Sequence, residues 1–209
     1  MKKSWRPTLP PNKSHKIKIF EEVIKTSGFI YQIGQSQMLR QSSKPVQLKK
    51  IGSPEFKKKL AYLKKCFWKF RKLTGKGRGI AAVQVGIPES FVLVYRKKEN
   101  KLWTLINPKI VNSSDKFLMY PEMCMSAAPL IAALRRPSWV KVEYYDEAGK
   151  KQVWDTKDSS KETTMLNWVL QHEIDHVRGI INIDKVDSKE LIFESDKNFY
   201  KKTTFQKTP

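Results

Sequence analysis

Residues 161–179 read KETTMLNWVLQHEIDHVRG, and this stretch decides both the expected fold and the expected chemistry. Apolar side chains recur at helical spacing ahead of an H-E-x-x-H pattern, serines precede the stretch as candidate N-caps, and a glycine ends it. A helix places His172 and His176 one turn apart on the same face, where two imidazoles can bind one divalent ion. Glu173 lies beside the first imidazole, in position to take a proton from a water molecule on the metal.

Two histidines do not complete a catalytic metal site, which usually needs three protein ligands and an open position for water. One common zinc-protease pattern has a third histidine six residues after the second, but Asn182 stands there. Glu190 and Glu194 are candidates on spacing alone, and Cys124 offers a thiolate that Fe²⁺, Co²⁺, Ni²⁺ or Zn²⁺ accepts. The residues therefore predict a metal site and leave its third ligand open.

The remaining segments predict an α+β fold rather than a parallel βαβ array. Ser53-Pro54-Glu55 begins an amphipathic helix that ends at Gly75. We expect antiparallel β-sheets around the central helix that bears the H-E-x-D-H residues, with an N-terminal helix and a possible C-terminal helix within residues 188–200. The predicted strands cover residues 91–95, 102–106, 138–145 and, after a turn at 146–149, 152–154.

Positive charge is concentrated in the first part of the chain. The formal net charge is +21, and residues 1–79 hold 21 Lys and Arg against 3 Asp and Glu, whereas residues 80–209 hold 20 and 17. Much of this charge lies on the polar face of the helix predicted at 53–75. A polyanion such as RNA or the ribosome is therefore a candidate partner, although a solvated helix face is the commoner explanation of such a run.

Residues 1–18 contain three prolines and scattered lysines without apolar periodicity, so we expect a basic flexible arm before a single catalytic domain at 19–209. An organellar targeting peptide is the alternative. Two cysteines do not make a disulfide framework, which favours a reducing compartment. The longest nearly uncharged stretch, residues 123–134, is too short to span a bilayer. We expect a cytoplasmic protein without membrane attachment.

Three motifs follow one another along the chain: G-R-G-I-A-A-V-Q-V-G at 77–86, the residues around Cys124 at 122–126, and H-E-I-D-H at 172–176. They stand in the order found in peptide deformylases, and the sequence resembles that family from about residue 33 to residue 187. The second, E-M-C-M-S at 122–126, has Met123 where the family usually has glycine. Each motif alone is weak, but three in order make a chance match very improbable.

The resemblance implies hydrolytic removal of the formyl group from the N-formylmethionine of nascent polypeptides. One divalent ion, natively Fe²⁺ in bacterial members and replaceable by Ni²⁺, Co²⁺ or Zn²⁺, converts bound water to the attacking hydroxide. A glutamate acts as general acid and base, while a glutamine amide and the backbone N–H after the cysteine stabilise the oxyanion. The resemblance assigns Cys124, His172 and His176 to the metal, Glu173, Gln84 and Met125 to catalysis, and Gly77, Gly79, Ile80, Glu122 and Met123 to substrate binding.

The expected partners are a formyl-Met nascent peptide and, through the basic surface, the ribosome, and we expect a monomer. Arg135 or Arg136 is expected to pair with Glu122 or Asp175 and so to support the metal ligands. Met123 adds bulk beside the thiolate and is expected to narrow the substrate cleft or to weaken substrate binding. The alternatives are another metal-dependent amidase or peptidase built on the same site, or a non-catalytic protein that binds the ribosome or RNA.

Overall fold

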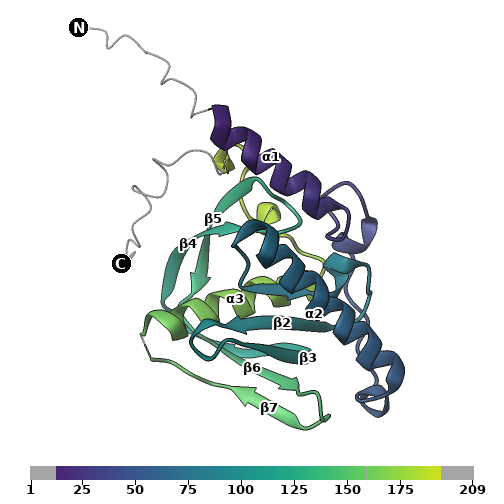
Figure 1. Cartoon of the computed structure of the whole chain (residues 1–209). Helices are drawn as coiled ribbons and strands as arrows, with labels where there is room; N and C mark the ends of the chain where they lie inside the picture. The colour runs from purple at the N-terminus through teal and green to yellow at the C-terminus, as the bar shows by residue number, and fades with distance from the viewer. Residues whose placement is uncertain (1–12, 159, 194–209) are drawn as a thin grey trace, which may run out of the picture.

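A computed structural model of the chain describes residues 13–158 and 160–193 as an α+β fold with antiparallel sheets (Figure 1). This architecture agrees with the fold class expected from the sequence. The helices are α1 (Lys13–Ser27), α2 (Pro54–Thr74) and α3 (Lys161–Val177), and the strands are β1 (Gly79–Ala81), β2 (Phe91–Arg96), β3 (Lys101–Ser113), β4 (Phe117–Met123), β5 (Leu130–Pro137), β6 (Val140–Tyr145), β7 (Lys151–Trp154) and β8 (Ile192–Phe193).

Two antiparallel sheets organise the molecule. The larger sheet has the order β1-β2-β3-β6-β7, and the smaller has the order β4-β5-β8. Strand β1 lies at an edge of the larger sheet and pairs with β2 alone among the described strands.

The larger sheet is covered on both faces. Phe91 and Leu93 of β2 point into a core shared with α2, whereas Val92 and Val94 point into a second core shared with α3. Successive side chains of a strand point to opposite faces, so the continuous apolar run of β2 fits a strand buried on both sides. Helix α3 is thereby fixed against the sheet whose edge strand is β1.

The two helices predicted from capping signals are confirmed. Ser53 caps α2 by accepting a hydrogen bond from the Phe56 N–H, and Gly75 ends the helix in the left-handed conformation with φ of 69°. Ser160 caps α3 in the same way by accepting from the Thr163 N–H. Both helices then bury the apolar faces that their sequence periodicity indicates.

The N-terminal region differs from the expectation of an arm over residues 1–18. Residues 13–18 belong to α1, and the part of the expected arm at 1–12 lies outside the described residues. Ile19 and Thr26 are buried where α1 packs against the rest of the chain. This helix depends on tertiary contacts, which explains why the Lys-rich local sequence did not indicate it.

The described part of the C-terminal region does not form the helix considered for residues 188–200. It consists of a 3₁₀ turn at Ser188–Glu190 followed by β8, which pairs with β5. Residues 194–209 lie outside the part of the chain that the structure describes. Among the described helices, none has the length and apolar character required to cross a membrane.

Candidate metal centre and active site

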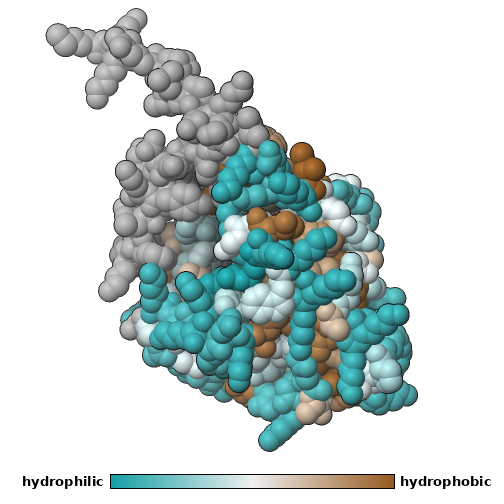
Figure 2. All heavy atoms as spheres, viewed as in Figure 1, coloured by the Kyte–Doolittle hydropathy of each residue, from teal (hydrophilic) through white to brown (hydrophobic). Residues whose placement is uncertain are grey.

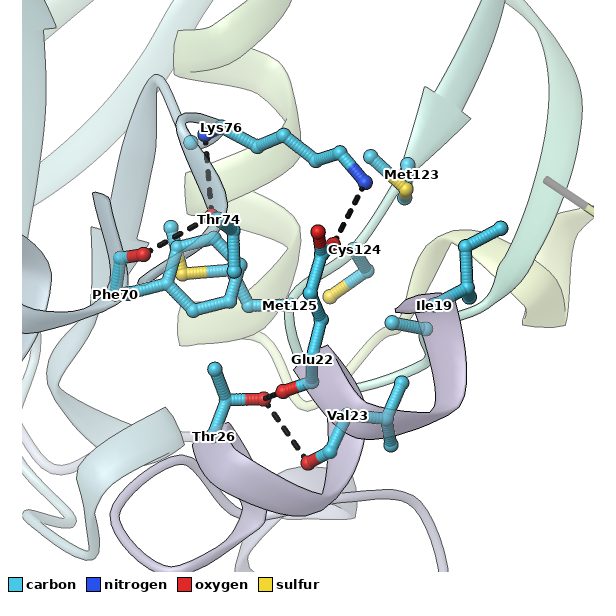
Figure 3. A pocket seen from close by; sticks show the side chains of 12 residues that line it. Ile19, Glu22, Val23, Thr26, Phe70, Thr74, Lys76, Met123, Cys124 and Met125 are labelled. Atoms are coloured by element: carbon cyan, nitrogen blue, oxygen red, sulfur yellow. Dashed lines mark hydrogen bonds and ion pairs between the residues drawn. The ribbon is translucent and has the colours of Figure 1, made fainter. Parts of the chain in front are cut away.

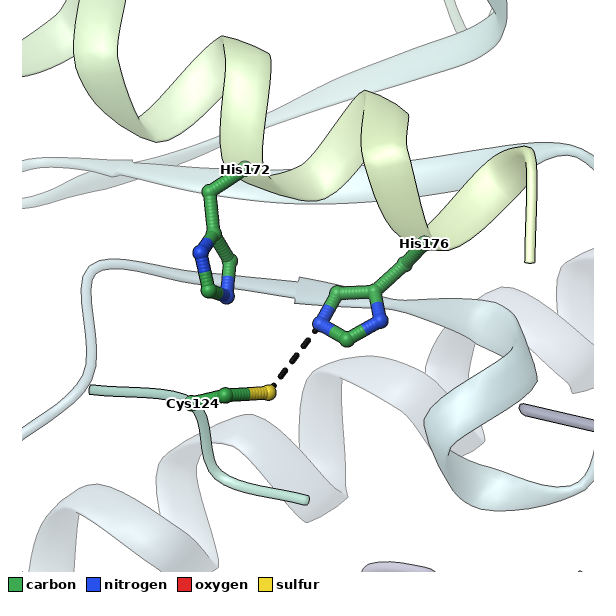
Figure 4. A group of neighbouring side chains, drawn as sticks. All are labelled: Cys124, His172 and His176. Atoms are coloured by element: carbon green, nitrogen blue, oxygen red, sulfur yellow. Dashed lines mark hydrogen bonds between the residues drawn. The ribbon is translucent and has the colours of Figure 1, made fainter. Parts of the chain in front are cut away.

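Helix α3 brings the two histidines together as the sequence predicts. The ring centroids of His172 and His176 are 5.1 Å apart, one helical turn along the same face. Cys124 directly follows β4 and is fully buried, and its Sγ lies 3.2 Å from His176 Nε2. Figure 4 shows both imidazole rings directed toward this sulfur.

The three side chains fit a single divalent ion. One donor atom from each of Cys124, His172 and His176 lies within 4.8 Å of the other two. Donors bonded at 2.0–2.3 Å to one tetrahedral ion lie about 3.5 Å apart, so small adjustments complete the geometry. Burial by itself raises the pKa of the Cys124 thiol, but His176 and His172 outweigh burial and lower that pKa to about 5. The cysteine is thus disposed to be the thiolate that a metal requires.

Of the glutamates considered as third ligand, Glu190 is exposed in the 3₁₀ turn and is absent from the Cys-His-His cluster. Glu194 lies outside the described residues.

Glu122 connects the metal centre to a buried charge network. Its Oε2 lies 2.7 Å from His172 Nδ1, which leaves Nε2 of that ring for the metal. Arg136 donates two hydrogen bonds to Glu122, at 2.5 and 2.8 Å, and one to Asp175 at 2.6 Å. Burial by itself raises the pKa of Glu122, but Arg136 and His172 lower it to about 2. The expected pairing is confirmed for Arg136, whereas Arg135 lies over the Phe117 ring.

Two further supports of Glu122 were not singled out in the sequence. Trp168 Nε1 donates to the carboxylate at 2.7 Å, and Asn182 Nδ2 donates to the backbone carbonyl at 2.9 Å. In the sequence, Asn182 stands where one zinc-protease pattern has its third histidine, and where deformylases commonly have a bulky apolar residue. Its position relative to the H-E-x-x-H pattern does not predict the hydrogen bond to Glu122. That bond forms because the chain after α3 packs against the end of β4.

Glu173 is buried beside the metal cluster with unused hydrogen-bonding capacity. Its side chain is 3% exposed, and Oε2 has no hydrogen-bond partner among the described residues. Burial raises the pKa of Glu173 to about 7 against the opposing influence of His172 and His176. A Cβ added at Gly79 would lie 2.5 Å from Glu173 Oε1, so the glycine of the first motif makes room for this carboxylate.

Gln84 is buried beside the cysteine. Its Oε1 accepts a hydrogen bond from the Ala81 N–H at 2.8 Å, and Nε2 donates to Ser126 Oγ at 3.0 Å. The same Nε2 lies 3.6 Å from Cys124 Sγ. The Met125 N–H donates to no group in the described part of the chain. Two N–H donors therefore stand close to the cysteine.

A cleft of about 220 Å³ opens beside His172 and Glu173. The predicted substrate-binding residues Gly77, Gly79, Glu122 and Met123 line it. Ile80 does not, because its side chain is fully buried in the core between α2 and the sheet. The apolar wall of the cleft comes from Met165, Trp168 and Val169, which the sequence marked only as positions on a helix.

A second, smaller pocket of about 50 Å³ lies under α1 (Figure 3). Met123 and Met125 line both pockets, so they separate the small pocket from the cleft. Glu22 of α1 forms an ion pair with Lys76 at 3.0 Å and connects the helix to the residue before Gly77. Helix α1 therefore covers the side of the second motif that faces away from Glu173.

A buried Cys-His-His cluster, an adjoining glutamate and an open cleft on an antiparallel α+β fold define a metal-dependent hydrolase. The family model for polypeptide deformylase matches residues 29–191. The chain belongs to the polypeptide deformylase family and is a metal-dependent enzyme that removes the formyl group from nascent peptides. Helix α1 precedes the matched region.

Curated relatives and solved structures support this assignment. The chain is 36% identical to the peptide deformylase of Brucella suis over 157 residues, covering 71% of this chain and 79% of the relative. Against the enzyme of Rhizobium meliloti the identity is 36% over 53% of this chain and 62% of the relative. The crystal structure of a peptide deformylase from Synechococcus elongatus in complex with actinonin matches with a TM-score of 0.63 and 26% identity, covering 83% of this chain and 84% of that one. A probable peptide deformylase from Synechococcus phage S-SSM7 matches with a TM-score of 0.62 and 28% identity, covering 75% and 98%.

Proposed function

We propose that one divalent ion, held by Cys124, His172 and His176, enables the chain to release formate from N-formylmethionine at the start of nascent polypeptides. The observation that carries this proposal is the convergence of the three donors with buried Glu173 on a single cleft. A metal bound there lowers the pKa of water and polarises the formyl carbonyl. We propose Fe²⁺ as the native ion and Ni²⁺, Co²⁺ or Zn²⁺ as substitutes, because one thiolate and two imidazoles suit ions of intermediate softness.

Glu173 acts as general base and then as general acid. Its unpartnered Oε2 takes the proton from the attacking water, and the same oxygen returns it to the amine that leaves. Gly79 supports this role because any larger side chain at that position displaces the carboxylate. Glu122 and Arg136 act through His172, whose ring they hold in one orientation.

The oxyanion that forms on the formyl group is stabilised by Gln84 and Met125. The Gln84 amide is oriented by its two hydrogen bonds, with Nε2 on the side of Cys124. The Met125 N–H is the second donor, and its lack of a partner among the described residues supports that role. Donors fixed in advance stabilise developing charge without reorganising during the reaction.

The substrate peptide binds as a strand along the free edge of β1. Gly77 and Gly79 allow the backbones to approach closely, and Ile80 contributes through its backbone, because its side chain belongs to the core. The methionine side chain of the substrate packs on the apolar wall formed by Trp168 and its neighbours. Met123, which also lines the cleft, narrows it.

We place the reaction in the cytoplasm, with the chain acting as a monomer that docks on the ribosome through its basic surface. The concentration of Lys and Arg in residues 1–79 supports the docking, because ribosomal RNA is a polyanion at the place where nascent chains emerge.

Formate release under anaerobic conditions tests the proposed reaction. The Fe²⁺- or Ni²⁺-loaded protein is expected to release formate from formyl-Met-Ala-Ser and to leave acetyl-Met-Ala-Ser and the internal peptide bonds intact. Cleavage of peptide bonds, or faster release of acetate than formate, would instead identify another amidase or peptidase. A metal-loaded protein that binds ribosomes but hydrolyses none of these substrates would be the non-catalytic alternative.

A further inference from the structure

We propose that the outward face of α2 is a docking surface for an unpaired stretch of RNA. Residues 54–76 contain nine Lys and Arg and a single acidic residue, Glu55. This proposal names α2 as the place where the proposed docking on the ribosome occurs. It rests on the proposed function only for the choice of the ribosome as the cellular source of the RNA. Neither the metal centre nor the cleft involves this face of the helix.

Three lysines form a row along the helix. Lys58, Lys65 and Lys72 follow one another at seven-residue intervals and therefore lie on nearly the same line, over about 21 Å at 1.5 Å per residue. All three are exposed, and none forms an ion pair with a carboxylate of the described residues. Lys69 widens the row and places its Nζ 4.1 Å from the centroid of the Phe29 ring.

Two lysines at the sides of this face, Lys59 and Lys64, have acidic partners within the chain, in contrast to the row. Lys59 pairs with Glu55 and Glu89, each at 2.7 Å, and Lys64 pairs with Glu147 at 2.7 Å. Lys69 stands four residues after Lys65 and three before Lys72, and like charges at these spacings oppose helix formation. A helix face that is only solvated usually carries side chains of both positive and negative charge. This row carries positive charge alone and is complementary to an external polyanion.

Two aromatic residues lie on either side of the lysine row. Tyr62 is 45% exposed and Trp68 is 42% exposed. Trp68 is held by edge-on contacts with Phe67 and Tyr95, with centroids 5.3 and 5.4 Å apart, so its exposed part is fixed in place. Figure 2 has the same view as Figure 1, with α2 toward the viewer. It shows hydrophilic side chains, in teal, over much of this face, with paler, less hydrophilic side chains between them. Aromatic rings beside a basic row favour unpaired RNA over an acidic protein, because bases stack on such rings.

Salt-dependent RNA binding by the full chain tests the row. The probe is a fluorescent single-stranded RNA of about 12 nucleotides, observed by anisotropy. Each neutralised phosphate contributes about −0.7 to the slope of log K against log salt, so the triple variant K58Q/K65Q/K72Q should have a slope shallower by about 2. The matched control K101Q/K109Q/K116Q removes the same charge from exposed positions outside α2 and should keep the steeper slope. Equal loss in both variants, or no binding by the unmodified chain, would overturn the proposal.

Tyr62→Ala tests the stacking contribution separately. Loss of one stacked base is worth about 1–3 kcal/mol, so affinity should fall about 5- to 150-fold while the salt slope stays the same. Unchanged affinity in Tyr62→Ala, equal affinity for duplex RNA, or displacement of the RNA by poly-glutamate at equal charge would contradict an unpaired-RNA surface. Formate release is measured on the same samples. If the triple variant loses RNA binding but still releases formate, the result supports the RNA surface. If the unmodified chain binds RNA but releases no formate, the result overturns the proposed reaction and leaves the RNA surface standing.

Discussion

Individual residues in the centre depend on each other through contacts of a few ångströms. Arg136 holds two carboxylates, Glu122 and Asp175, in a region where all three side chains are buried. Glu122 then orients His172, and Gly79 leaves the space that Glu173 occupies. The metal ligands and the base are therefore positioned by residues that would not themselves contact a metal.

Replacing Arg136 by Met should destabilise the fold strongly. The substitution leaves Glu122 and Asp175 buried with less compensation, and breaking a buried ion pair typically costs about 3–5 kcal/mol. The free energy of unfolding from denaturant titration measures the loss. Arg135→Met is the matched control, since Arg135 is the exposed neighbour, and it should change stability by less than about 1 kcal/mol. Equal effects of the two substitutions would contradict the role given to Arg136.

Replacing Gly79 by Ala should slow turnover without removing the metal. The added methyl group would lie 2.5 Å from Glu173 Oε1, so the carboxylate must move. A displacement of about 1 Å in a reacting group can cost about 100-fold in rate, and we expect a loss of that order in kcat with unchanged metal content. Gly28→Ala is the control, because a Cβ there has no neighbour within 4 Å. Normal kcat in Gly79→Ala would remove the steric explanation for this glycine.

At the scale of elements, capped helices fix the positions of the site. Helix α3 starts at a serine cap and carries both histidines, while β4 ends immediately before Cys124. The two elements come from distant parts of the sequence, and the cluster forms only where they meet. The position at which α3 starts therefore helps to fix where His172 and His176 lie relative to Cys124.

Ser160→Ala should lower the free energy of unfolding by about 0.5–2 kcal/mol, because the Thr163 N–H loses its acceptor at the start of α3. Thermal or urea unfolding measures the change. Ser27→Ala removes an exposed hydroxyl that bonds within its own helix and should change stability by less than about 0.5 kcal/mol. A Ser160→Ala protein as stable as the parent would show that the cap contributes little to α3.

Local signals in the sequence were sufficient for some elements and insufficient for others. Helices α2 and α3 were predictable because caps, apolar spacing and terminal glycines all agree. Helix α1 and the β4–β5 hairpin were not, because α1 is stabilised by packing and β4 contains Pro121 and lacks clear alternation. In the site, the motifs indicated the metal cluster, whereas the contacts of Trp168 and Asn182 with Glu122 depend on the tertiary structure.

The whole molecule combines a basic N-terminal part with a nearly charge-balanced remainder. Residues 1–79 carry most of the excess positive charge, and they include α2, whose outer face is far richer in lysine than in acid. The metal ligands come from residues 124–176, in the balanced part. The proposed RNA-docking surface on α2 and the candidate metal ligands therefore lie in different parts of the chain.

Removing the metal should destabilise the whole fold. A metal that binds only the folded chain adds about 2.7 kcal/mol when its concentration is 100 times its dissociation constant, so chelation should lower the unfolding temperature and added Ni²⁺ should restore it. Calorimetry of the full chain measures both steps. In Cys124→Ser the metal-dependent part of the shift should largely disappear, because a thiolate ligand is lost. A chelation shift that is equal in Cys124→Ser and in the parent would place the metal elsewhere.

The central claim is that Glu173 and a metal on Cys124, His172 and His176 together perform deformylation. Its most direct test is anaerobic formate release from formyl-Met-Ala-Ser by the parent chain and Glu173→Gln, each loaded with one Ni²⁺ per chain. General acid–base catalysis typically contributes about 10²- to 10⁴-fold, so Glu173→Gln should bind the metal equally but release formate slower by at least about 100-fold. No formate from the loaded parent, or equal rates from the two proteins, would contradict it.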